Sequence, residues 1–159
     1  MVALIETGRA VVDDAESLIT SVVGSKRLPD GRKAMILDAG VNLMFTAYWY
    51  HHECQPTRLI EGVAEETVLY GPLCMNIDVM RSSVWLPPLS VGDSLVFNPV
   101  GAYNNTQWQQ FIEYRPAIVM VHENGDVSEV RTPDTLQTML HQERLPDRLA
   151  RPYPQGLPD

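Results

Sequence analysis

Four consecutive side chains in the middle of the chain, His51-His52-Glu53-Cys54, are all of types that bind metal ions. Imidazole nitrogens and thiolates are the usual protein ligands of zinc. Adjacent residues point in different directions, however, and no second pair of such ligands stands at a suitable spacing. We therefore expect no metal site here, and we expect the segment to be a solvent-exposed loop.

A second set of reactive side chains is spread along the chain. Glu6 and Arg9 flank Gly8, and Cys74 and Tyr103 each follow a glycine by two or three residues. A guanidinium fork suits phosphate oxygens, and a glycine lets the backbone approach an anion closely. A thiol with a pKa near about 8.5 can donate a proton at neutral pH. Each residue also has an ordinary explanation, as a solvated charge, a buried thiol or a core tyrosine.

The composition is that of one ordinary globular domain. The 159 residues are 45% hydrophobic and 20% charged, and 20 acidic against 12 basic residues give a net charge of -8. Such a charge argues against nucleic acid and anionic membranes as partners. No apolar run reaches the roughly 20 residues of a membrane span, and no signal peptide is apparent. Two cysteines without a secretory signal favour a reduced, cytoplasmic protein.

The pattern of apolar residues predicts many short strands separated by turns. Asn124-Gly125, between two apolar runs, is the strongest hairpin signal in the chain. We expect a mainly β fold: a closed or partly open, antiparallel or mixed β-barrel from about Leu18 to Arg131, with this hairpin at its edge. The expected strands lie in Leu18–Val23, Lys33–Ala39, Leu59–Tyr70, Val91–Val100, Ala117–His122 and Val127–Arg131.

The remaining segments predict few helices. Ala10–Ser17 is a candidate short helix. Thr132-Pro133-Asp134 opens another, near Thr135–His141, with Thr132 as its N-cap and Pro133 at the first helical position. Met1–Ile5 is expected to be a buried strand that exits through Glu6–Arg9, and the prolines after Leu145 predict a loose tail.

Four segments together resemble the fold-type III, pyridoxal-phosphate-dependent decarboxylases, which act on ornithine, lysine, arginine and diaminopimelate. Glu6-Thr7-Gly8-Arg9 is similar to the family's Glu-Pro-Gly-Arg, and Gly71–Asp78 is similar to its Gly-Pro-x-Cys-x-x-x-Asp. Asp38–Asn42 resembles Asp-Ala-Gly-x-Asn, and Gly101-Ala102-Tyr103 matches Gly-Ala-Tyr. Their order and spacing agree with the family over roughly residues 2 to 140. The resemblance also implies a short helix at Asn104–Phe111.

The resemblance implies a domain organisation. Residues 1–9 would be a remnant of the last strand of a TIM barrel, residues 10–143 the C-terminal β-barrel domain, and residues 144–159 a proline-rich tail. The lysine that binds the cofactor belongs to the TIM barrel, and the chain's two lysines, Lys26 and Lys33, flank the Pro29-Asp30-Gly31 turn instead. The chain would then be an engineered domain, a truncated product or half of a split enzyme, inactive alone, with Ala3–Arg9 packing as a stray strand or swapping into a partner.

The resemblance also implies roles for individual residues. Glu6 would lie beside the pyridine nitrogen of pyridoxal 5'-phosphate, and Gly8, Arg9 and Tyr103 would contact its phosphate. Cys74 would be the catalytic proton donor, presented across a homodimer interface to the other subunit. Tyr50 and Asp78 would belong to the substrate pocket.

Two departures from the family bear on the substrate. Met75 stands where many relatives have an acid that holds a distal amine, and Thr46-Ala47 stands where diaminopimelate enzymes have Arg-Pro. We therefore expect a polar amino-acid substrate other than diaminopimelate. Two alternatives stay open: a racemase-like relative, and a catalytically inactive barrel that serves as a dimerisation or binding module.

Overall fold

The structure is a computed structural model that describes residue 4 and residues 7–150. The chain divides into two compact units, residues 1–113 and 114–159. Most of the expected strand Met1–Ile5 lies outside the described residues, and so does Glu6. Gly8 and Arg9, expected in the loop after that strand, instead begin the helix α1 (Gly8–Val12), which continues into the 3-10 turn η1 (Asp13–Ala15).

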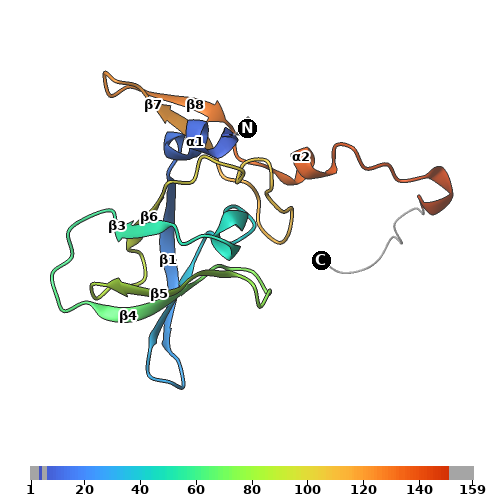
Figure 1. The fold of residues 1–159 in the computed structure, drawn as a ribbon. Coiled ribbons are helices and arrows are strands. Elements are labelled where there is room, and N and C mark those ends of the chain that lie inside the picture. The colour runs from blue at the N-terminus through green and yellow to red at the C-terminus, as the bar shows by residue number, and fades with distance from the viewer. Residues whose placement is uncertain (1–3, 5–6, 151–159) are drawn as a thin grey trace. The chain divides into compact units, whose positions relative to one another are not determined.

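The first unit is built on one six-stranded sheet with the order β3-β6-β1-β2-β4-β5 (Figure 1). Its pairs are antiparallel except β2 with β4, which is parallel, so the sheet is mixed. The strands are β1 (Leu18–Arg27), β2 (Lys33–Leu37), β3 (Glu53–Pro56), β4 (Glu65–Tyr70), β5 (Val79–Leu86) and β6 (Ser94–Asn98).

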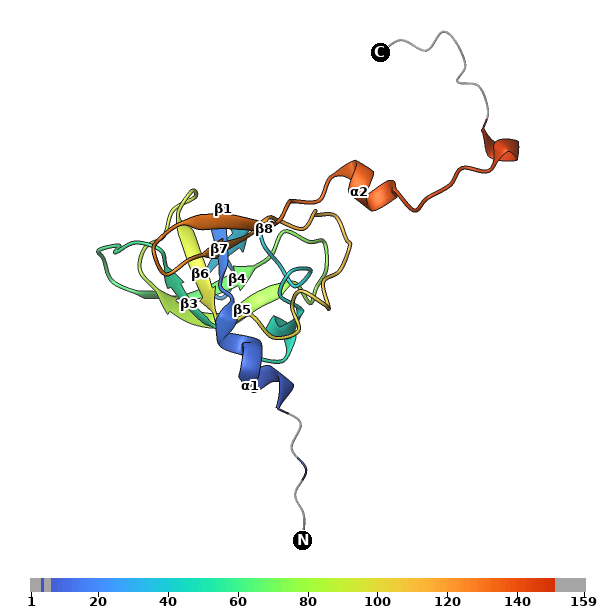
Figure 2. The ribbon, with the colours of Figure 1, turned by 90° about the horizontal axis from the view of Figure 1, so that it is seen from above.

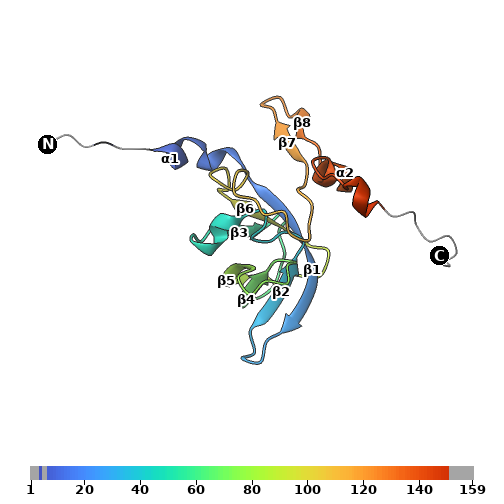
Figure 3. The same cartoon turned by 90° about the vertical axis from the view of Figure 1, so that its right-hand side faces the viewer.

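One long strand curls this sheet into a barrel that is nearly closed. β1 pairs with β6 through Leu18–Ser21 and with β2 from Val22 onward, with an irregularity in register between Val22 and Gly24. Such irregularities bend a strand and increase its twist. The edge strands β3 and β5 consequently approach each other across the barrel, as Figures 2 and 3 show. The predicted fold class is therefore confirmed.

The core of the barrel is apolar and completely enclosed. Alternate residues of β6, Leu95 and Phe97, point inward with no exposed surface, as the period of two in a strand requires. They meet Met35 and Leu37 of β2 and Leu69 of β4. Burying a side chain of this size contributes roughly 1.5–3 kcal/mol.

The expectation that the Asn124-Gly125 hairpin forms the edge of the barrel is wrong, because the hairpin belongs to the second unit and not to the barrel sheet. β7 (Ile118–Val121) and β8 (Val127–Arg131) form the hairpin, with Gly125 at a φ of 86°, but the two strands pair with each other in a sheet of their own. Neither strand contains a buried residue. The turn signal is local, whereas membership of the barrel sheet needs backbone pairing with a distant strand.

Two helix predictions need correction as well. Asn104–Phe111 forms turns and bends instead of a helix, because the side chain of Asn104 bonds the Val100 carbonyl and Gln109 donates its amide to Asn42. The helix α2 (Leu136–Leu140) lies where expected, but its N-cap is Thr135, which exchanges hydrogen bonds with Thr138, and not Thr132. The other short turns are η2 (Phe45–Tyr48) and η3 (Asp147–Leu149). No helix among the described residues is long and apolar enough to cross a membrane.

Candidate functional site

The structure brings Arg9 and Tyr50 into direct contact. The guanidinium carbon of Arg9 lies 4.0 Å from the centre of the Tyr50 ring, and its Nε donates to Asp13 at 2.8 Å. The carboxylate of Asp13 raises the pKa of Arg9, so the guanidinium keeps its charge. The side chain is still 32% exposed, and Tyr50 is 41% exposed. A charged fork resting on an aromatic face is held in place while it still faces solvent.

The loop that carries Tyr103 is tied to the same helical segment. Val100 and Gly101 donate their amides to the carbonyls of Glu16 and Asp13 at 3.0 and 2.9 Å. A Cβ at position 101 would overlap the Val12 carbonyl, so this close approach requires glycine. Tyr103 has a φ of 68°, in the left-handed region that a bulky residue rarely adopts, and its side chain is 47% exposed. The loop therefore presents Tyr103 outward beside the segment that carries Arg9.

Asp78 organises the loop that carries Cys74. The carboxylate accepts the amide of Val41 at 2.8 Å and that of Leu73 at 2.7 Å, and the residue is only 2% exposed. Burial raises the pKa of Asp78, and the two backbone hydrogen bonds act in the opposite direction. The carboxylate fills the space above Gly40 and Gly71, where a Cβ would overlap it. Asp78 thus faces the backbone of two loops, which is a position for holding Cys74 in place.

The two cysteines have different surroundings. Cys74 is exposed, whereas Cys54 packs against the core and its burial raises its pKa to about 12. A thiol with that pKa stays protonated and unreactive near neutral pH. Of the two thiols, Cys74 is the more exposed.

The predicted loop at His51–Cys54 is only partly a surface loop. His52 is 3% exposed, and β3 begins at Glu53. The side chain of His52, the residue before β3, turns inward, where its ring nitrogens lie within hydrogen-bond distance of the Thr46 hydroxyl and the Pro99 carbonyl. Among the described residues, no group of three or more potential ligands could hold a metal ion.

Two pockets border these elements. One, of about 260 Å³, lies between the end of η2, with Tyr48 and His51, and the residues Asn76 and Ile77 that follow Cys74. It joins the neighbours of Tyr50 to the neighbours of Cys74, although neither Tyr50 nor Asp78 is among its lining residues.

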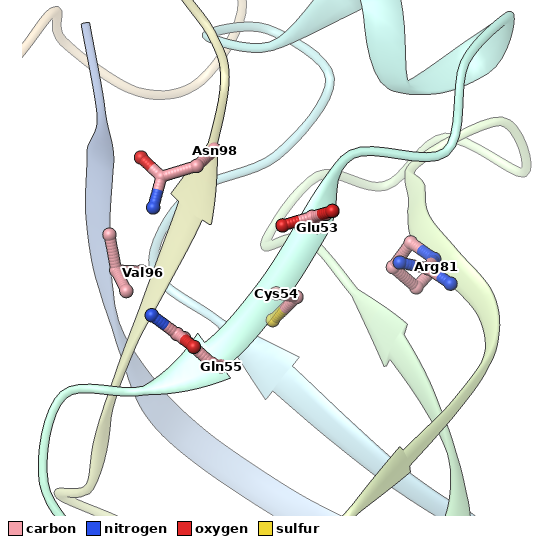
Figure 4. A pocket seen from close by; sticks show the side chains of 6 residues that line it. All are labelled: Glu53, Cys54, Gln55, Arg81, Val96 and Asn98. Carbon is pink, nitrogen blue, oxygen red and sulfur yellow. The ribbon is translucent and has the colours of Figure 1, made fainter. Parts of the chain in front are cut away.

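The second pocket, of about 330 Å³, was not predicted from the sequence. It lies at the seam of the barrel, where Figure 4 shows Glu53, Cys54 and Gln55 of β3 between Arg81 of β5 and Val96 and Asn98 of β6. Arg81 donates to the His52 carbonyl and so bridges the two edge strands. The sequence does not predict this pocket, because its pattern predicts neither β3 nor β5 as a strand.

The chain is similar to known proteins over most of its length. Residues 10–101 match the model of the family described as pyridoxal-dependent decarboxylase, C-terminal sheet domain. A diaminopimelate decarboxylase of Methanothermobacter thermautotrophicus is 32% identical over 92% of this chain, and a lysine/ornithine decarboxylase of Selenomonas ruminantium is 28% identical over 75%. The match covers 35% and 30% of those two relatives.

A solved structure has the same fold. The diaminopimelate decarboxylase of M. jannaschii, in complex with L-lysine, superposes with a TM-score of 0.82 at 28% identity. The match covers 89% of this chain and 33% of that one. The chain thus spans about a third of the length of the relatives that it matches.

Proposed function

Since the chain belongs to the pyridoxal-dependent decarboxylases as their C-terminal sheet domain, we propose that it works as part of an amino-acid decarboxylase that uses pyridoxal 5'-phosphate. The observation that carries the proposal is that Tyr50 and the loop that carries Tyr103 both contact the segment 8–16, to which Arg9 belongs. When bound, the cofactor supplies an electron sink for the bond-breaking step.

The residues Gly8, Arg9 and Tyr103 fit a phosphorylated cofactor. Arg9 offers a fixed cationic fork to the phosphate, and Tyr103 offers an exposed hydroxyl. Gly8 has nothing within 4 Å of where a Cβ would stand, which leaves room for an anion at the backbone. Glu6, outside the described residues, would pair with the ring nitrogen and keep it protonated.

Cys74 is the proposed proton donor to the substrate carbon after carbon dioxide leaves. It is exposed on a loop that Asp78 holds, so a partner subunit can reach it. We propose a homodimer, in the cytoplasm, in which the Cys74 face of each subunit meets the other about a two-fold axis. The exposed, neighbouring aromatic rings of Tyr48 and Trp49 support a covered surface on this domain.

The substrate is proposed to be an amino acid other than diaminopimelate. Thr46, which stands where the resemblance places the arginine of the diaminopimelate enzymes, is 2% exposed, and its hydroxyl oxygen lies within hydrogen-bond distance of His52 and Asn104. It therefore cannot clamp a second carboxylate. A complete enzyme with this domain should turn over diaminopimelate poorly, and steady-state kinetics that compare diaminopimelate with other polar amino acids would decide the point.

The complete enzyme is proposed to include a TIM-barrel part, in the same or a separate chain, that supplies the lysine for the cofactor. Within this sequence Lys33 bonds to the Leu89 carbonyl and faces Glu65, so its partners are residues of the barrel. The second candidate function is that of an inactive module, which uses the exposed rings of Tyr48 and Trp49 only for dimerisation.

Cofactor titration of the complete enzyme separates these two candidates. Arg9→Ala should weaken the affinity for pyridoxal 5'-phosphate by about ten- to a hundredfold, the value of a hydrogen bond to a charged group. Arg58→Ala is the matched control, since Arg58 is also exposed and ion-paired, with Asp93. Equal cofactor affinity in both variants would contradict the proposed phosphate contact, and an enzyme that binds no cofactor would favour the inactive module.

A further inference from the structure

A buried histidine lies under the loop that carries Tyr103. The Nδ1 of His52 is 2.6 Å from the Pro99 carbonyl oxygen, and its Nε2 is 2.7 Å from the hydroxyl oxygen of Thr46. The Thr46 hydroxyl is in turn 2.8 Å from Oδ1 of Asn104, whose Nδ2 donates to the Val100 carbonyl at 2.8 Å. The Thr46 amide also donates to Oδ1 of Asn104, at 3.3 Å. Together these contacts hold both ends of the segment 99–104, with Tyr103 between them.

The number of protons shared by these hydrogen-bonded groups limits which of the hydrogen bonds can form at the same time. The Pro99 carbonyl can only accept, so Nδ1 of His52 carries a proton. The single hydroxyl proton of Thr46 can go to His52 or to Asn104, but not to both. With Nε2 bare, Thr46 donates to the ring; with Nε2 protonated, the ring donates to Thr46, and the hydroxyl turns to Asn104.

The charges that face the ring come from three elements. They are Arg9 on α1, Asp13 on η1 and Arg81 on β5. Burial is the largest influence and lowers the pKa of His52; the Pro99 carbonyl and Asp13 raise it, and the two arginines lower it. The net effect is a lower pKa than usual, so the ring is neutral at pH 7, and Thr46 donates to it.

We propose that His52 is a positioning residue for Tyr103, which holds the loop with its neutral ring and releases the Thr46 hydroxyl to Asn104 when it gains a second proton. The inference rests on the proposed function only in treating Tyr103 as a cofactor contact. The hydrogen bonds themselves lie wholly within this domain.

Nitrogen NMR of the chain with isotopically labelled histidine tests directly which ring nitrogens of His52 carry a proton. At pH 7.5 the signals of His52 should show the proton on Nδ1 and a bare Nε2, with His51→Ala used to assign the neighbouring histidine. A proton on Nε2 with Nδ1 bare would overturn the inference, because Nδ1 would then face the Pro99 carbonyl without a donor.

Hydrogen exchange of the Thr106 and Gln107 amides, which both bond to the Tyr103 carbonyl, tests the effect on the loop. Thr46→Val keeps the shape but removes the hydroxyl, and should speed exchange by up to about tenfold, while Thr46→Ser should exchange like the wild type. His52→Asn keeps a donor for Pro99 but cannot become charged.

The pH dependence of this exchange supplies the deciding comparison. After correction for intrinsic rates, the wild-type loop should change its exchange across the titration of His52, and His52→Asn should not. Equal exchange in the valine and serine variants, or an unchanged pH profile in His52→Asn, would overturn the inference. None of these measurements involves the cofactor, so a failure to bind it would count against the proposed function alone.

Discussion

Cys74 and Cys54 show how the surroundings of a residue decide its chemistry. Cys74 is exposed on a loop, whereas Cys54 packs against the core, where burial holds its thiol protonated. Iodoacetamide should therefore modify Cys74 readily at pH 8 and leave Cys54 almost untouched in the folded chain. Mass spectrometry after brief labelling checks this, and equal modification of both thiols would contradict the assigned environments.

In a complete enzyme the same contrast predicts the kinetics. Cys74→Ala should lower the turnover rate by about 10²–10⁴, the usual cost of losing a general acid, or deliver the proton to the wrong position. Cofactor binding should stay nearly intact. Cys54→Ala, the matched control, should affect stability only. Normal turnover and product in Cys74→Ala would reassign Cys74 to a structural role.

Gly71 illustrates a residue fixed by its neighbours. A methyl group there would overlap both carboxylate oxygens of Asp78 and the Cα of Gly40. Gly71→Ala should destabilise the chain by about 1–3 kcal/mol, the usual cost of overpacking. Gly8→Ala is the control, because its methyl meets nothing within 4 Å. Urea unfolding of both variants compares the two, and equal midpoints would contradict the close approach.

The buried carboxyl of Asp78 gives a pH-dependent prediction. Its pKa is raised in the folded chain by burial, so the stabilising contribution of the protonated form is complete below the unfolded pKa of about 3.9. That contribution is lost as pH rises through the folded pKa. The stability difference between wild type and Asp78→Asn should therefore shrink from pH 4 towards pH 7, measured by urea unfolding. A difference that grows over this range would contradict the prediction.

At the scale of single elements, α2 depends on its cap. The helix has five residues, none of them buried, so local hydrogen bonds carry most of its stability. Thr135→Ala removes the N-cap and should cost this helix about 0.5–2 kcal/mol, visible as faster amide exchange at Met139. Thr132→Ala should leave that exchange unchanged. The midpoint of global unfolding should stay the same in both, since no packing is lost.

At the scale of the whole molecule, we expect association without catalysis. Of the two lysines, Lys26 lies over the Tyr70 ring and Lys33 bonds to the Leu89 carbonyl. We therefore expect the isolated chain to show no decarboxylase activity and only weak cofactor binding. Absorbance after mixing with pyridoxal 5'-phosphate checks the binding. Light scattering at low micromolar concentration should give a dimer, with Cys74 and Tyr103 near the interface, and a monomer alone would count against that interface.

The family and the class of the fold can be predicted from the sequence alone. Gly-Pro-Leu-Cys, Gly-Ala-Tyr and the other motifs are local strings, and the alternation of apolar residues in β1, β2 and β6 predicts strands without knowledge of their partners. The Asn124-Gly125 hairpin and the position of α2 were also predicted, since turn and helix signals act over a few residues.

The way in which these elements pair and pack depends on contacts between residues far apart in the sequence. β3 and β5 lack a clear strand pattern and exist because β6 and β4 supply their backbone hydrogen bonds. The inward turn of His52 and the burial of Asp78 depend on loops far away in sequence, at Pro99 and Val41. Burial and long-range hydrogen bonding are properties of the assembled fold, so no local pattern could reveal that Asp78 holds a loop or that His52 lies beneath Tyr103.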